Sequence, residues 1–137
     1  MVEQTQTATG GCMCRAIRYK ASSTPKGSGY CHCRSCRHHT GAPVVAFVVF
    51  TAEQVQWMSG SRARYESSPG IFRAFCRDCG TSLTWEGHHN GSDWVEFHIS
   101  TLDNPDEFPP NEHTHYSERI SWLHLTDELP KYQAAMD

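Results

Sequence analysis

Short runs of apolar and β-branched residues, separated by turn residues, recur along the chain. The clearest run, residues 44–50, is rich in Val and Phe and predicts a buried strand. Similar runs predict further strands at residues 16–19, 62–66, 71–75, 82–85, 94–99 and 120–125. Turns are indicated by Gly60, Pro69-Gly70 and Asn90-Gly91. The pattern predicts a mainly β fold of short strands.

Helical periodicity is absent from every long stretch of the sequence. A single helical turn after Cys33 is the expected exception, because it would bring the thiol of Cys36 back toward Cys33. Residues 103–110 contain three prolines and should form a structured loop. We expect residues 1–9 to be a disordered leader and residues 133–137 a loose tail. One domain, residues 10–132, remains between them.

Composition narrows the class of protein. The chain has 137 residues, a length that suits one domain with its own core. Its net charge is -3. A general nucleic-acid or membrane-surface binder would be basic, so neither partner is expected. The polar N-terminal stretch lacks the apolar segment of a signal peptide, and the apolar run 42–50 is too short to cross a membrane. We therefore expect a cytoplasmic protein, and the sequence does not predict its oligomeric state.

The seven cysteines fall into short clusters. They form a C-x-C pair, a C-x-C-x-x-C group and a C-x-x-C pair, namely Cys12 and Cys14, then Cys31, Cys33 and Cys36, then Cys76 and Cys79. An odd number cannot be used up in disulfides, and a disulfide between such close neighbours is strained. Two sulfurs at this spacing can bind one zinc ion.

Spacing leaves two ways to group the sulfurs. Cys12, Cys14, Cys76 and Cys79 could form one closed site, which would leave Cys31, Cys33 and Cys36 as a site with a free position. Alternatively, a zinc ribbon could pair Cys33 and Cys36 with Cys76 and Cys79, and the other three cysteines would then lack a partner. The spacing itself does not decide between these groupings.

The order of the motifs resembles one family. Gly11-Cys12-Met13-Cys14 is followed by Cys31-His32-Cys33-Arg34-Ser35-Cys36, Gly41, Phe75-Cys76-Arg77-Asp78-Cys79-Gly80-Thr81, Thr101-Leu102-Asp103, Ser121-Trp122 and Leu129-Pro130-Lys131-Tyr132. Residues 10–132 thereby resemble the glutathione-dependent formaldehyde-activating enzymes, a group that includes centromere protein V. One departure is Arg15, because the family usually has glycine after the second cysteine.

The resemblance implies a small β-tent fold of short antiparallel strands, stabilised by two zinc ions. Carried over to this chain, it assigns a structural zinc to Cys12, Cys14, Cys76 and Cys79, and a catalytic zinc to Cys31, Cys33 and Cys36. The implied activity is that of a carbon–sulfur lyase, the condensation of formaldehyde with glutathione to S-hydroxymethylglutathione, which would serve in detoxification. Two alternatives are a non-catalytic, zinc-stabilised binding module and a family enzyme for another thiol or carbonyl.

Other polar residues have weaker claims to a role. Arg34 and Arg37 flank the three-cysteine cluster and could bind the carboxylates of glutathione, or could simply lie on a solvated loop. Three histidines lie near the same cluster in the sequence: His32, His38 and His39. They could complete a zinc shell or carry a proton, although histidines are more commonly found at the surface without such a role. The pair His113 and His115 has no partner cluster in the sequence.

Two further groups concern the walls and chemistry of a pocket. The tryptophans are expected in the core or as a pocket wall; they are Trp57, Trp85, Trp94 and Trp122. Asp93 and Glu96 could act as acid or base, but nothing in their spacing pairs them.

Overall fold

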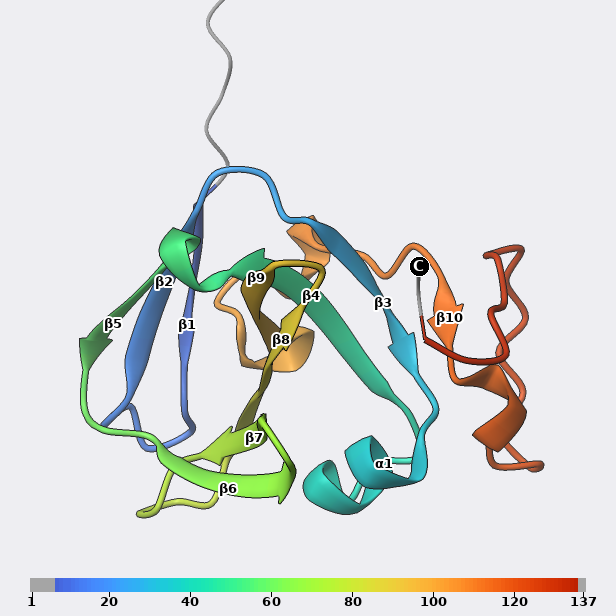
Figure 1. Ribbon diagram of the computed structural model, residues 1–137, viewed down its shortest axis with the longest axis horizontal. Coiled ribbons are helices and arrows are strands. Elements are labelled where there is room, and N and C mark those ends of the chain that lie inside the picture. The colour runs from blue at the N-terminus through green and yellow to red at the C-terminus, as the bar shows by residue number, and fades with distance from the viewer. Residues whose placement is uncertain (1–6, 136–137) are drawn as a thin grey trace, which may run out of the picture.

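The computed structural model describes residues 7–135, which form two β-sheets (Figure 1). The smaller sheet has three antiparallel strands in the order β1–β2–β5, with bounds Thr7–Gly11, Arg18–Ser22 and Val55–Ser59. The larger sheet has seven strands in the order β10–β3–β4–β9–β8–β7–β6. Their bounds are His113–Thr114, Gly27–Cys31, Val45–Thr51, Ser92–His98, Ser82–His89, Ile71–Phe75 and Ala63–Ser68. The prediction of a mainly β fold is confirmed; one neighbouring pair, β10 and β3, is parallel.

Helices are short. Among the described residues the one α-helix is α1, Arg34–Thr40, which connects the end of β3 to the start of β4 (Figure 1). It confirms the expected helical turn after Cys33 and extends it to seven residues. Four 3-10 helices, η1 to η4, cover Ala52–Gln54, Ile99–Thr101, Pro105–Glu107 and Tyr116–Glu118. No helix within residues 7–135 is long and apolar enough to cross a membrane.

Strand β4 is buried on both faces, which explains its unbroken apolar sequence. Val48 and Phe50 join the main core, where Tyr19 stacks on Phe97 with ring centroids 3.9 Å apart. Phe47 and its alternate neighbours pack on the opposite face with Cys31 and Cys36. The buried strand predicted at residues 44–50 is confirmed, and it separates the core from the three-cysteine cluster.

The strand predicted at residues 120–125 is wrong. This segment contains a turn and irregular backbone, and Trp122 is 66% exposed. The outer edge of β10 is taken farther along the chain, where His113 exchanges backbone hydrogen bonds with Pro130 and Tyr132.

The ends of the domain also differ from the expected boundaries. Strand β1 starts at Thr7, and Ala8 is buried opposite Ala21, so residues 7–9 are ordered rather than part of a leader. In the expected tail, the carbonyl of Ala134 accepts a hydrogen bond from the backbone N–H of His115. Residues 1–6 and 136–137 of the expected leader and tail lie outside the described residues.

Candidate metal centres

The seven cysteine sulfurs lie in a group of four and a group of three. Within each group the sulfurs lie within 4.8 Å of one another, and the members are Cys12, Cys14, Cys76 and Cys79, and Cys31, Cys33 and Cys36. None of the seven forms a disulfide. The grouping matches the division that the family resemblance implied, and the zinc-ribbon alternative is not formed.

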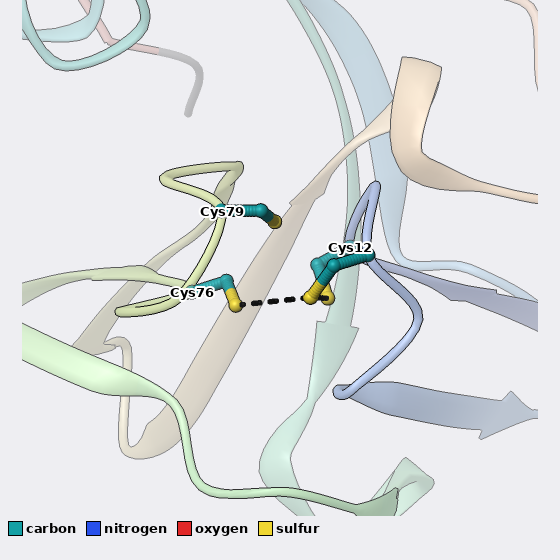
Figure 2. Close-up of side chains that lie close together, drawn as sticks. Cys12, Cys76 and Cys79 are labelled. Atoms are coloured by element: carbon teal, nitrogen blue, oxygen red, sulfur yellow. Dashed lines mark hydrogen bonds between the residues drawn. The ribbon is translucent and has the colours of Figure 1, made fainter.

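The four-cysteine cluster joins loops from the two sheets. Figure 2 shows Cys12 directed toward Cys76 and Cys79 from a separate loop. The sulfur of Cys14 lies 3.5 Å from that of Cys12 and 3.8 Å from that of Cys76. Sulfurs on a tetrahedral zinc, each about 2.3 Å from the ion, would be about 3.8 Å apart. The donor set and its spacing therefore fit a zinc ion.

The two loops of this cluster turn in similar ways. The carbonyl of Cys76 accepts a hydrogen bond from the N–H of Gly80 at 2.8 Å, and Gly80 has a φ of 79°. In the other loop the carbonyl of Cys12 accepts from the N–H of Arg15 at 3.0 Å, and Arg15 has a φ of 69°. Left-handed backbone favours glycine. The departure from the family pattern at Arg15 thus puts a strained residue beside the cluster.

The three-cysteine cluster is formed where β3 ends and α1 begins. Cys31 is the last residue of β3, and Cys33 caps α1 by accepting a hydrogen bond from the N–H of Cys36 at 3.3 Å. The buried guanidinium of Arg73 donates to the sulfur of Cys36, also at 3.3 Å. Hydrogen bonds from Cys31 and Cys36 hold the pKa of Cys33 far below its usual range, whereas the bond with Cys33 raises that of Cys31. Of the three thiols, Cys33 is therefore the one that loses its proton most readily.

A cavity of about 430 Å³ opens beside this cluster. Its apolar wall consists of Phe47, Val49, Trp85 and Trp94. Its ionisable groups, apart from the cysteines, are Lys26, Arg73, His89, Glu96, His115 and Glu118. The three sulfurs thus face a space of the size that binds small molecules, about 300–1,000 Å³.

The arginines singled out from the sequence lie elsewhere. Neither Arg34 nor Arg37 lines the cavity. Arg34 is exposed, and the side chain of Arg37 donates to the carbonyl of His32. The cations that do line the cavity are Lys26 and Arg73.

The histidines near the clusters have other contacts. His32 Nε2 lies 2.8 Å from His113 Nδ1, and His113 Nε2 lies 2.9 Å from a carboxylate oxygen of Asp127. This chain of contacts, in which both histidines are buried, fastens the C-terminal segment to the loop that carries the three cysteines. His39 packs edge-on against His98, and His38 is exposed. Neither sulfur cluster gains a histidine from the described residues.

Sequence reasoning overlooked Arg73 and left Glu96 without a partner. Both lie inside predicted strands, where a charged residue at an inward-facing position is the available signal. Trp85 and Trp94 form part of the cavity wall and Trp57 packs on the core, in line with expectation. Trp122, by contrast, is exposed, which corrects the expectation for that residue.

Comparisons with known proteins agree with the fold and the cysteine pattern. A protein from Schizosaccharomyces pombe named as an uncharacterised lyase is 36% identical over 76 residues, which cover 54% of this chain and 53% of that protein. The chain thus spans about half of that relative. A solved structure of a Rhodobacter sphaeroides protein has a TM-score of 0.56 at 18% identity, covering 74% of this chain and 96% of that one, and so shares the fold. The family model described as glutathione-dependent formaldehyde-activating enzyme matches residues 7–118. The chain belongs to the family of glutathione-dependent formaldehyde-activating enzymes.

Proposed function

We propose that this chain is a zinc-dependent carbon–sulfur lyase acting on adducts of glutathione, or another small thiol, with an aldehyde, in the manner of S-(hydroxymethyl)glutathione synthase. The observation that carries the proposal is a group of three cysteine sulfurs facing a cavity of about 430 Å³. A purely structural zinc site uses four protein ligands, whereas a site with three protein ligands leaves a position for a substrate. Membership of the family supports glutathione as the thiol.

The donor set determines which chemistry suits the cavity. Three thiolates outweigh the charge of one zinc ion, so water activation is poorly served there. Zinc held by Cys31, Cys33 and Cys36 would supply the positive charge that keeps an incoming thiol deprotonated. A free thiol with a pKa of about 8.5 is otherwise mostly protonated at neutral pH.

The chain's own residues prepare the rest of the site. The guanidinium of Arg73 offsets negative charge at Cys36, to which it donates. The rings of Phe47, Trp85 and Trp94 form an apolar wall that can hold a carbonyl compound near the sulfurs. Lys26, exposed at the cavity, is available to a carboxylate of glutathione. A cavity of this size beside the three sulfurs favours a small-molecule substrate over the binding-module alternative.

The test compares two cysteine variants with the wild type. Exchange NMR would measure the rate at which formaldehyde and glutathione interconvert with their adduct, and elemental analysis would count metal ions. We expect two zinc ions per wild-type chain, and Cys33→Ser should lose one of them together with the acceleration of exchange. Ser35 also lines the cavity but has no thiol. The Ser35→Ala variant should therefore keep both zinc ions and the acceleration of exchange. An unchanged rate in Cys33→Ser, with one ion lost, would refute the proposal.

A further inference from the structure

The strand register aligns four side chains on the cavity face of the larger sheet. Val49 of β4 pairs with Glu96 of β9, Glu96 pairs with Trp85 of β8, and Trp85 pairs with Arg73 of β7. Directly paired residues of neighbouring strands share a face. All four also line the cavity of the three cysteines. The carboxyl group of Glu96 therefore belongs to that cavity, between an aliphatic and an aromatic neighbour.

Glu96 has no polar partner of its own. Within residues 7–135, neither a side-chain hydrogen bond nor an ion pair engages its carboxyl group. Glu86 on the adjacent strand shows the contrast, because it accepts two hydrogen bonds from Arg62 at 2.8 Å and one from Thr84 at 2.6 Å. Glu96 is half-buried, and it lines the cavity instead of pairing with another side chain. Glu96 is free to engage a ligand in the cavity.

The surroundings of Glu96 favour its neutral form. Burial raises the pKa of Glu96 to about 8; Arg73 opposes this rise, and Cys33 adds to it. The paired neighbours from β4 and β8, Val49 and Trp85, carry no charge. The other ionisable groups of the cavity are Lys26, Cys31, Cys36, His89, His115 and Glu118. A carboxyl group that titrates near neutral pH can both donate and accept a proton.

We propose that Glu96 is the general acid–base for the carbon–sulfur chemistry of this cavity, an inference that rests on the proposed function. In adduct formation the thiol sulfur bonds to the carbonyl carbon, the π pair moves to the carbonyl oxygen, and Glu96 gives its proton to that oxygen. The proton released by the thiol then returns to the carboxylate of Glu96. In the reverse direction Glu96 takes the hydroxyl proton of the adduct while the carbon–sulfur bond breaks. Neither direction needs an oxidant or a reductant.

Two glutamine variants isolate this role. Glu96→Gln removes the proton donor and keeps the size of the side chain. Glu112→Gln is the matched control, because burial also raises the pKa of Glu112 and its Oε2 is buried without a partner, yet Glu112 does not line the cavity. Both variants lose an unpaired carboxyl group, and only one of them loses it from the site.

The measurements are adduct exchange by NMR from pH 6 to 9, glutathione binding by calorimetry, metal content, and carboxyl titration in protein labelled with ¹³C at glutamate. Glu96→Gln should slow exchange by about 100-fold or more, with glutathione affinity and metal content kept. Glu112→Gln should exchange at the wild-type rate. A carboxyl signal that titrates near pH 8 should be present in the wild type and in Glu112→Gln, and missing from Glu96→Gln.

The outcomes separate this inference from the proposed function. A Glu96→Gln variant that matches the wild-type rate would overturn the role of Glu96 and leave the proposed function standing. A loss of rate fully explained by weaker glutathione binding would also overturn it, since Glu96 would then be a binding group. A wild-type protein that holds its metal and binds glutathione without accelerating exchange would overturn the proposed function and this role together.

Discussion

The four-cysteine cluster closes a long loop, and its loss should therefore be costly. Cys14 and Cys76, which it brings together, are 62 residues apart in the sequence. The chain-entropy relation for a cross-link gives about 4 kcal/mol for a loop of that length. Cys76→Ser should lower the free energy of unfolding of the metal-loaded protein by at least this amount, which corresponds to roughly 15 °C in Tm.

The matched control is the same change in the other cluster. Cys33 and Cys36 are only three residues apart, and the same relation gives about 2 kcal/mol for Cys33→Ser. Urea unfolding at pH 7, followed by tryptophan fluorescence with metal content measured in parallel, would give both values. Wild-type protein treated with a chelator provides a check that needs no mutation. Equal losses in the two variants, or a chelated wild type as stable as the loaded one, would refute the reasoning.

Two further predictions concern pH and backbone strain. The pKa of Glu96 is raised to about 8 in the folded state. Between the ordinary glutamate pKa and pH 8, the folded state therefore binds more protons than the unfolded state does. The contribution of Glu96 to the free energy of unfolding is thus complete at low pH and falls as the pH rises toward 8. The stability of the wild type relative to Glu96→Gln should fall by up to about 1.4 kcal/mol per pH unit between pH 5 and 8 in urea unfolding; a constant difference would contradict this. Arg15→Gly should raise stability by roughly 1 kcal/mol, because the φ of 69° costs less for glycine, whereas Gly80→Ala should lower it by a similar amount. Calorimetry would check both, and a lower Tm for Arg15→Gly would show that its backbone is not strained.

The sequence predicts features that depend on neighbouring residues better than those that depend on distant pairing. The apolar run of β4 and the helical turn after Cys33 both follow from local composition and spacing. Strand β3 was missed because its sequence, with two glycines and a serine, has little intrinsic preference for a strand. Its conformation comes from pairing with β4 on one side and β10 on the other.

In the candidate site, too, the features set by neighbouring residues can be predicted and those set by distant pairing cannot. The cysteine clusters can be found from spacing, although the spacing leaves their grouping open. The relation of Glu96 to Arg73 cannot be found in this way, because it depends on the register of three strands, β7, β8 and β9. A charged residue within a strand is visible in the sequence, but the cavity it faces is not.

The four-cysteine cluster can also be completed only late in the synthesis of its own residues on the ribosome. Cys14 leaves the ribosome 62 residues before Cys76, an interval of roughly 3 to 12 s at 5–20 residues per second. During that time Cys12 and Cys14 form an incomplete site, open to any soft metal ion or oxidant that the nascent chain meets. The hairpin of β1 with β2 can therefore be linked to the loop after β7 only once Cys76 and Cys79 have been synthesised.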